Sequence, residues 1–461
     1  MSETMTTTTA PAGVATVPVV LKTRTGYVIP TENYMIPTSW RRFHLSQLIN
    51  KVLALPQPVP FDFIVRGEML RTSLGDWCAV KGIEEEETLD IEYIESVLPP
   101  ERVSSIPHPD WVSSISCHLK GYFLTGSYDS CVRLYNDRQE LLHTISSHSA
   151  PVSSVCFIPR PEADSSETQL VASSSYDTAC HIVSIPMDNM NTTDDEERPP
   201  LKALASLQLH TAPVSSVTSN LSGSTLLTAG WDSYIGVWTT DIPESDEVDE
   251  VVHTNIEADR RKRRKVKKDE NAPVRKAPQT VMKSHTSRIS SLQWSPVSSE
   301  PKIVFSCSWD FTARSWDVEA GVCTATMTAA EKAMLDIAVT CNGRNLISAN
   351  GDRTASVFAI GSSGPPSHLS HTSPVSSIAA HPTSAHHVAS GCMDGIVRIW
   401  DLRNTKSAVE SFVATGDQQG PGKEGKKLLA SKVLSLDWSQ GNLVGCGGEK
   451  GVDIFRVKLG N

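Results

Sequence analysis

The 461-residue sequence contains no apolar run that approaches the ~18 residues needed to span a membrane. Its 10 cysteines are scattered singly, without a CxxC pair or the spacing of a zinc site. Because no secretory segment precedes them, we expect reduced, buried thiols in an intracellular protein. Basic residues are outnumbered, and the net charge of −10 argues against a generally basic nucleic-acid binder.

The sequence also lacks the local patterns of common catalytic sites. It has no glycine-rich phosphate loop, no nucleophile elbow and no cluster of metal ligands. We therefore expect a protein that is not an enzyme and that has no cofactor of its own.

What the sequence does contain is a repeat. Three segments share one register, in which a Ser or Thr lies four residues before an Asp and a Trp lies six residues after it. With the histidine that opens each segment, the three sets are His210, Thr228, Asp232 and Trp238; His285, Ser306, Asp310 and Trp316; and His371, Ser390, Asp394 and Trp400. An indole N–H, a hydroxyl, an imidazole and a carboxylate can satisfy one another across three strands. These sets therefore predict structural networks and not hydrolase triads.

The turn Asp, or its equivalent, recurs seven times with a partner six residues later: Asp129/Tyr135, Asp177/Val183, Asp232/Trp238, Asp310/Trp316, Asp352/Phe358, Asp394/Trp400 and Glu449/Phe455. This register resembles the WD-repeat signature and predicts a seven-bladed β-propeller over 99–461. Units two, five and seven have degenerated, and unit five has no His where one is expected. We expect residues 102–106 to form the outer strand of the last blade and so close the ring.

Before the repeats lies a smaller unit. Residues 1–16 are Thr- and Ala-rich and predict disorder. Strands are expected at 17–26, 34–40, 61–65, 68–70 and 89–94, with one helix at 43–55 that places Leu45, Leu48, Ile49, Val52 and Leu55 on one face. This order is that of a ubiquitin-like β-grasp domain over 17–98. No Gly-Gly end follows, so a docking domain is expected and the whole chain is mainly β.

Insertions interrupt the repeats at 159–169, 186–200 and about 240–280, and a flexible piece is expected at 416–427. The third insertion begins acidic and continues with a basic run: Arg260, Arg261, Lys262, Arg263, Arg264, Lys265, Lys267 and Lys268. Such a run indicates a nuclear import signal or a segment that contacts RNA, and a merely solvated loop is the alternative.

The residue before each turn Asp is often large and apolar: Tyr128, Tyr176, Trp231, Trp309 and Met393. In a propeller these positions face one end of the ring, where they would form a partner-binding patch of hot-spot residue types. The alternative is that each side chain packs on its neighbouring loop.

The N-terminal phrases PFDF (60–63) and LRTSL (70–74), followed by KGIEEEETLDIEY and then the repeats, resemble a notchless-like domain joined to a seven-bladed propeller. That arrangement is similar to the Ytm family of ribosome-biogenesis WD-repeat proteins, which form a trio with pescadillo and block-of-proliferation. The resemblance implies a non-enzymatic assembly factor for the large ribosomal subunit in the nucleus, nucleolus and nucleoplasm. The propeller would bind the block-of-proliferation partner, pre-ribosomal RNA contact is possible, and no membrane is involved.

The resemblance further implies that the ubiquitin-like domain docks on the AAA ATPase midasin and presents a carboxylate to a Mg²⁺ held by that ATPase. By register from the Leu89–Tyr93 strand the carboxylate is that of Glu86, although Glu85 or Glu87 could take its place. A second class of function remains open, a WD-repeat substrate adaptor of a ubiquitin ligase, and co-purification with pre-ribosomal RNA would distinguish the two.

Overall fold

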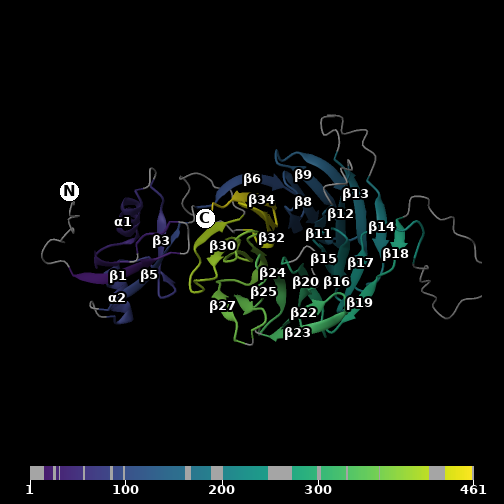
Figure 1. The fold of residues 1–461 in the computed structure, drawn as a ribbon. Coiled ribbons are helices and arrows are strands. Elements are labelled where there is room, and N and C mark those ends of the chain that lie inside the picture. The colour runs from purple at the N-terminus through teal and green to yellow at the C-terminus, as the bar shows by residue number, and fades with distance from the viewer. Residues whose placement is uncertain are drawn as a thin grey trace, which may run out of the picture. The chain divides into compact units, whose positions relative to one another are not determined.

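The computed structural model describes residues 15–23, 27–30, 32–54, 58–83, 87–96, 99–160, 168–187, 201–247, 273–297, 303–328, 331–362, 364–414 and 431–458. The chain forms two compact units, one made mainly of residues up to 100 and the other of 101–400 and 411–456 (Figure 1). No helix in the described ranges is both long and apolar enough to cross a bilayer.

The first unit is one mixed sheet with two helices. Its elements are β1 (Thr16–Lys22), β2 (Asn33–Pro37), α1 (Arg42–Leu53), β3 (Phe61–Val65), β4 (Glu68–Met69), α2 (Leu74–Lys81) and β5 (Leu89–Glu95). The strands lie in the order β2-β1-β5-β3-β4, with β1 and β5 parallel in the centre. This is the order of a β-grasp sheet, and β1 begins at Thr16, inside the segment that was expected to be disordered. Residues 1–14 lie outside the described ranges.

Helix α1 covers the sheet with Leu45 and Ile49, which are both fully buried. The expected face is partly wrong, because Val52 is 40% exposed and Leu53 packs on the core in its place. One turn of helix is 3.6 residues, so Leu53 continues the line from Leu45 through Ile49, and the buried face is rotated toward it. Leu55 lies outside the described ranges.

Helix α2 was not predicted, although its sequence carries a start signal. The Ser73 hydroxyl accepts the Asp76 N–H at 3.2 Å, and Gly82 ends the helix in the left-handed region at φ 66°. Within it, Leu74, Trp77 and Cys78 are buried at the i, i+3 and i+4 spacing. A capping Ser followed by this short apolar pattern could have located the helix.

The second unit consists of seven sheets in the described residues, each mostly four-stranded and antiparallel. Blade 1 has β7 (Val112–Ser116), β8 (Tyr122–Ser127), β9 (Val132–Asn136) and β10 (Leu141–Ile145). Blade 2 has β11 (Val152–Ile158), β12 (Thr168–Ser175), β13 (Cys180–Pro186) and β14 (Ala203–Leu207). Blade 3 has β15 (Val214–Ser219), β16 (Thr225–Gly230), β17 (Tyr234–Thr239) and β19 (Thr280–Lys283).

The ring continues in the same way. Blade 4 has β20 (Ile289–Trp294), β21 (Ile303–Ser308), β22 (Thr312–Asp317) and β23 (Val322–Thr328). Blade 5 has β24 (Met334–Val339), β25 (Asn345–Asn350), β26 (Thr354–Ala359) and β27 (Ser367–Ser370). Blade 6 has β28 (Val375–Ala380), β29 (His387–Cys392), β30 (Ile396–Asp401) and β31 (Glu410–Val413). Blade 7 has β32 (Val433–Gln440), β33 (Leu443–Gly448), β34 (Gly451–Arg456) and, from the start of the unit, β6 (Glu101–Pro107).

Blade 7 closes the ring as predicted. Strand β6 pairs antiparallel with β34, so that Pro107 lies opposite Gly451 and Glu101 opposite Arg456 (Figure 1). The guanidinium of Arg102 binds the buried carboxylate of Asp453 through Nε at 2.9 Å. The first strand of the unit thus covers the edge of its last blade, which leaves no open seam for another chain to pair with.

The insertions depart from expectation where they can be followed. Strand β12 begins at Thr168, within the loop expected at 159–169. The end of the third insertion forms β18 (Val274–Lys276), which pairs in parallel with β14 and gives blade 2 a fifth strand. Residues 161–167, 188–200, 248–272 and 415–430 lie outside the described ranges.

Serine hydroxyls join the innermost strands of neighbouring blades. Each donates to the first backbone carbonyl of the next inner strand: Ser113 to Val152 at 2.7 Å, Ser153 to Val214 at 2.6 Å, Ser215 to Ile289 at 2.5 Å, Ser290 to Met334 at 2.8 Å and Ser376 to Val433 at 2.5 Å. Between blades 7 and 1, the Asp437 carboxylate accepts the Cys117 N–H at 2.5 Å. These bonds fix the blades to one another around a central channel of about 640 Å³.

Candidate functional site

The polar set of blade 3 forms one chain of hydrogen bonds. Trp238 Nε1 donates to Thr228 Oγ1 at 2.9 Å, and the same hydroxyl lies 2.9 Å from His210 Nε2. The other imidazole nitrogen, Nδ1, lies 3.0 Å from Asp232 Oδ2. The indole and the hydroxyl are fully buried, so each of these two groups has its hydrogen-bond partner only within this set.

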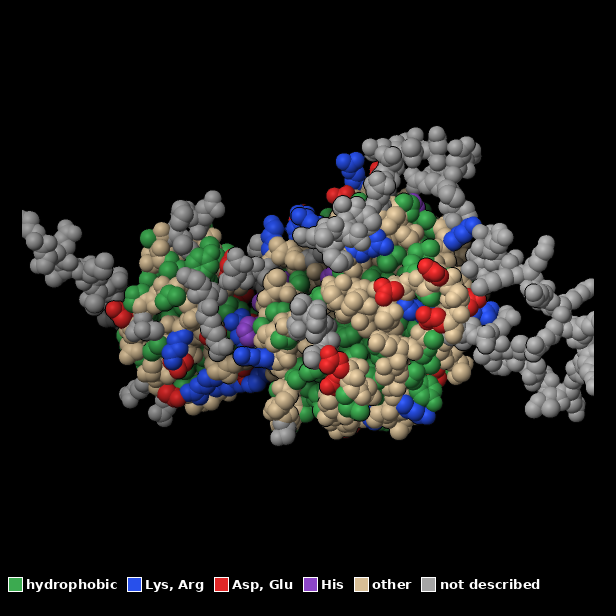
Figure 2. All heavy atoms as spheres, turned by 45° about the vertical axis from the view of Figure 1, so that its right-hand side comes forward, with side chains coloured by type: hydrophobic (Ala, Val, Ile, Leu, Met, Phe, Trp, Pro, Cys, Tyr) green, Lys and Arg blue, Asp and Glu red, His purple; other side chains and the backbone are tan. Residues whose placement is uncertain are grey.

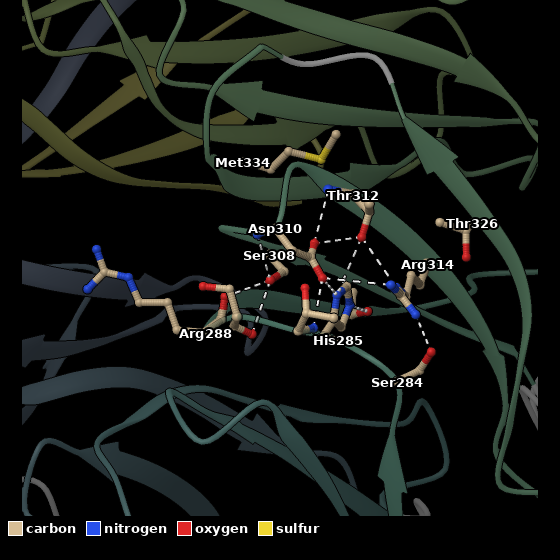
Figure 3. A network of polar contacts seen from close by, with 12 residues as sticks. Ser284, His285, Arg288, Ser308, Asp310, Thr312, Arg314, Thr326 and Met334 are labelled. Atoms are coloured by element: carbon tan, nitrogen blue, oxygen red, sulfur yellow. Dashed lines mark hydrogen bonds and ion pairs between the residues drawn. The ribbon is translucent and has the colours of Figure 1, made fainter.

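Blade 4 repeats this chain with shorter distances. Trp316 Nε1 and His285 Nε2 both lie 2.7 Å from Ser306 Oγ, and His285 Nδ1 lies 2.8 Å from Asp310 Oδ2. Thr312 donates its hydroxyl to Asp310 at 2.6 Å, and Arg314 completes the network (Figure 3). The Ser306 hydroxyl is fully buried, so the set cannot present a nucleophile to a substrate.

The pKa values show that these carboxylates are held in their charged form. Burial opposes the charge of Asp310, but hydrogen bonds from Thr312 and His285 outweigh it and lower its pKa to about 2. Burial lowers the pKa of His285 despite the neighbouring carboxylate. The groups therefore stabilise one another in the fold and leave no free acid or base for proton transfer.

Blade 6 differs from the expected pattern. Trp400 and His371 bind Ser390 at 2.9 and 2.8 Å, but His371 Nδ1 lies 2.9 Å from the Leu369 carbonyl and not against Asp394. The Asp394 carboxylate accepts from Thr372 and Arg398 at 2.6 and 3.1 Å. Because Arg398 supplies the positive charge opposite Asp394, the His371 imidazole can turn to the backbone carbonyl. Burial lowers the pKa of His371 to about 4. The prediction of a His371–Asp394 link was wrong.

Blade 2 is more complete than the sequence indicated. His148 Nδ1 lies 3.0 Å from Asp177 and Nε2 lies 2.8 Å from Ser173, so only the Trp is replaced, by Val183. In its interior His181 stacks on His148 with ring centroids 4.5 Å apart and an interplanar angle of 8°. Burial and the neighbouring His148 lower the pKa of His181 to about 4.

The five residues predicted to face one end of the ring do lie in equivalent positions. The backbone N–H of each bonds to the residue that precedes the inner strand of its own blade: Tyr128 to Trp111, Tyr176 to Pro151, Trp231 to Pro213, Trp309 to Arg288 and Met393 to Pro374. The side chains of Trp231, Trp309 and Met393 are 40, 41 and 39% exposed. Tyr128 and Tyr176 are half-buried.

Four of these five residues are aromatic, and their rings are linked to one another. Ring centroids are 6.0 Å apart for Trp111–Tyr128, 6.2 Å for Tyr128–Tyr176 and 5.6 Å for Tyr176–Trp231. Arg288 lies between Trp231 and Trp309 and joins the last ring to the others. We call Trp111, Tyr128, Tyr176, Trp231 and Trp309 the aromatic arc. It runs over blades 1 to 4, whereas blade 5 has Gly351 at the equivalent position and separates Met393 from it.

Sequence reasoning missed Trp111 and Arg288, although their position is readable. Each immediately precedes the Val-Ser-Ser or Ile-Ser-Ser phrase that opens an inner strand, where blades 2, 3 and 6 have proline. A proline there is an ordinary turn residue, so a Trp or an Arg in its place is the signal.

The predicted acidic and basic segments lie largely outside the described ranges. This holds for Glu85 and Glu86 and for the basic run Arg260–Lys268. Glu87, which remained an alternative to Glu86, is described and forms an ion pair with Arg66. Among the described residues, no group of three or more His, Cys, Asp or Glu could hold a metal ion.

On the side of the second unit visible in Figure 2, acidic and basic side chains are interspersed among apolar and uncharged ones. The aromatic arc, which runs over four blades, is the distinctive surface feature of the described part of the ring.

A WD-repeat β-propeller that follows a β-grasp unit defines the class of this protein, and family models agree. The NLE (NUC135) domain matches residues 17–78, and the WD domain, G-beta repeat, matches 101–136, 139–184, 201–239, 276–317 and 364–401. The unmatched stretches include blades 5 and 7, whose polar sets had degenerated.

Similar proteins narrow the class to one family. The chain is 44% identical to "Ribosome biogenesis protein YTM1" of Laccaria bicolor, over 97% of this chain and 96% of that protein. It is 30% identical to the protein of the same name from Saccharomyces cerevisiae (91% and 92% covered) and to "Ribosome biogenesis protein WDR12 homolog" of Arabidopsis thaliana (93% of each covered). The chain therefore belongs to the YTM1/WDR12 family of ribosome biogenesis proteins.

The buried histidine pair of blade 2 predicts a loss of stability in mild acid. The folded-state pKa of His181, about 4, lies below the unfolded value. Its contribution is therefore complete above about pH 6.5 and is lost as the pH falls toward 4. Between pH 7.5 and 5, we expect the wild type to lose about 2 kcal/mol more unfolding free energy than His181→Asn.

Urea unfolding of the full chain at both pH values measures this difference. His368→Asn, which changes an exposed histidine of blade 5, serves as the control and should retain the wild-type pH dependence. If His181→Asn also retains it, His181 does not take up a proton on unfolding.

Proposed function

We propose that this protein is a non-enzymatic assembly factor in maturation of the large ribosomal subunit. Membership of a family whose relatives are named ribosome biogenesis proteins supports the process. The aromatic arc is the single observation that supports the role, because it is an exposed apolar surface on a ring whose polar sets are engaged in holding the fold. In this proposal the propeller binds the block-of-proliferation WD-repeat protein in a trio with pescadillo, and the complex sits on the pre-ribosomal particle.

The composition of the arc supports protein binding. Trp and Tyr are the residue types that carry most of the binding energy at protein interfaces, and Arg is the third. The exposed Trp231 and Trp309 lie on adjacent blades, and their backbones are fixed by hydrogen bonds to Pro213 and Arg288. A surface fixed in this way loses little conformational entropy when a partner covers it.

Replacing Trp231 or Trp309 by Ala should weaken binding of the block-of-proliferation partner by about 2 kcal/mol or more, roughly 30-fold. Neither change should lower the melting temperature much, since both side chains are about two-fifths exposed. Trp238→Ala is the matched control, because that indole is fully buried and bonded to Thr228. It should cost about 3–5 kcal/mol of stability.

Calorimetric titration beside thermal melts separates the two effects. Large losses of melting temperature in Trp231→Ala and Trp309→Ala, with unchanged affinity per folded molecule, would assign these residues to the core instead.

In the same proposal, the N-terminal unit is the handle on which the AAA ATPase midasin pulls to release the complex from pre-ribosomes. Glu86 would complete the ligand shell of a Mg²⁺ that the ATPase holds, since a hard cation prefers carboxylate oxygen. The segment that carries it lies between two fixed points, the end of α2 at Gly82 and the start of β5 at Leu89. Glu87, the next residue in the chain, forms an ion pair with Arg66. The pairing favours Glu86 over Glu87, because the Glu87 carboxylate is already engaged.

Glu86→Asp should lose most midasin binding. The change shortens the side chain by one methylene, about 1.5 Å, and Mg²⁺ demands near-ideal octahedral geometry. Glu87→Asp is the matched control and should bind normally. Wild-type binding should disappear with a chelator and return with Mg²⁺.

A pull-down between the two purified full-length proteins provides the measurement. Normal binding by Glu86→Asp with loss in Glu87→Asp would move the ligand by one residue. Binding that resists the chelator would remove the metal from the interaction.

Nuclear entry is proposed to depend on the basic run between Arg260 and Lys268, in which eight of nine residues are basic. Replacing these basic residues by Ser and Gly should shift the protein toward the cytoplasm, as seen by fluorescence of a tagged full chain. Cells depleted of the block-of-proliferation partner exclude import on that partner. Unchanged nuclear accumulation in those cells would show that the run is not the signal.

A further inference from the structure

The Arg288 side chain is held between two indole rings of the aromatic arc. Its guanidinium carbon lies 3.1 Å from the ring centroid of Trp309 and 4.7 Å from that of Trp231. The backbone carbonyl of Arg288 accepts from the Ser308 hydroxyl at 2.8 Å and from the Trp309 N–H at 3.0 Å. Both ends of the residue are therefore fixed, so its guanidinium is oriented before any partner arrives.

This guanidinium has no carboxylate partner among the described residues, unlike three arginines on the third strands of blades 1, 4 and 6. Arg133, Arg314 and Arg398 each form an ion pair with the turn Asp four residues before them. Lys432, which occupies the position of Arg288 in blade 7, lies 3.1 Å from Glu449. In Figure 3 the Arg288 side chain points away from the Asp310 network, and no contact is drawn to its guanidinium.

A further aromatic residue lies in the turn that follows Trp309. Phe311 is 46% exposed and has a φ of 65°, in the left-handed region. Blades 1, 2, 3 and 6 place Ser130, Thr178, Ser233 and Gly395 in the equivalent position. A bulky side chain costs roughly 1 kcal/mol there and adds nothing to the core. Phe311 is thus more exposed than Trp309 and also has the less favourable backbone conformation.

We propose that Arg288 receives an Asp or Glu side chain of the protein partner, flanked by apolar residues that cover Trp231, Trp309 and Phe311. The inference rests on the proposed function of the aromatic arc and names the chemistry of the partner's contact. A guanidinium offers two parallel N–H groups to a carboxylate, and surrounding apolar surface strengthens the pair by excluding water. The pair then adds charge complementarity to a contact that is otherwise made by apolar side chains.

A carboxylate fits better than a nucleic-acid strand. Stacking of bases requires open aromatic faces, whereas Arg288 already lies against a face of both Trp231 and Trp309. The net charge of −10 and the mixed charges on the side of the propeller that Figure 2 shows do not favour a nucleic-acid strand as the ligand of this residue.

The test is the affinity of the full chain for the purified propeller of the block-of-proliferation partner. Arg288→Leu should weaken binding roughly tenfold or more, and Arg288→Lys should weaken it similarly because an ammonium lacks the planar fork. Arg353→Leu removes a charge from the exposed turn of blade 5 and is the matched control, with less than threefold change expected. Thermal melts of each variant verify folding.

Charge reversal then identifies the contact. Arg288→Glu should abolish binding, and one partner variant from a series of single surface Asp or Glu to Arg changes should restore it. Failure of every such variant to restore binding would overturn the proposal. So would unchanged affinity of Arg288→Leu; if Trp231→Ala still weakens binding, the aromatic arc remains the partner site without the carboxylate.

Two other outcomes are separable. If changes at Arg288, Trp231 and Trp309 all leave the partner's affinity intact, the proposed function of the arc fails together with this inference. If the partner binds normally but Arg288→Leu loses binding of a single-stranded 20-nucleotide uridine RNA that the wild type binds, the anion is a phosphate and the carboxylate assignment is wrong.

Discussion

The hydroxyl bonds between neighbouring inner strands are the constraint on which the propeller depends. A blade is a small sheet that cannot bury both faces alone, so it is stable only when its neighbours are held against it. Serines supply this link at most junctions, for example from Ser215 to the Ile289 carbonyl at 2.5 Å. Blade 5 has Leu335 in that position, and the half-buried Asp336 instead accepts from Ser377 and from the Ile378 N–H of blade 6. Burial raises the pKa of Asp336, yet these donors satisfy it.

A ring linked in this way fixes the turns of neighbouring blades relative to one another. The residues before each turn Asp bond to the backbone at the start of the inner strand, so the hydroxyl links and the aromatic arc share the same segments. Trp231 and Trp309 therefore become neighbours through the junction of blades 3 and 4, although 78 positions separate them in the chain. The polar sets stabilise blades 2, 3, 4 and 6 internally, and the residues that we propose as the partner surface adjoin their turn Asp residues.

Much of the fold could be predicted from the sequence because its signals are local and recur. The spacing of Thr228, Asp232 and Trp238 fixes three strands and one turn, and repetition then gives the ring and its closure by β6. Strand β18 could not be predicted, since a three-residue parallel pairing after a long insertion has no local signature. The hydrogen-bond partner of His371 could not be predicted either. Its imidazole lies against the Leu369 carbonyl and not against Asp394, because Arg398 binds Asp394. For the site, the positions of the turn residues and of Arg288 could be read from the sequence, but the contact of Arg288 with Trp231 and Trp309 depends on the packing of two blades.

Hydrogen–deuterium exchange of the full chain, alone and with the block-of-proliferation partner, tests the central claim most directly. Partner binding at the aromatic arc should slow exchange of the backbone amides in the turns after β8, β12, β16 and β21, which carry the arc residues of blades 1 to 4. The equivalent turns of blade 5 and blade 7 should change little. Slowed exchange confined to blades 5 to 7, or to the outer strands, would contradict the assignment of the arc as the partner surface.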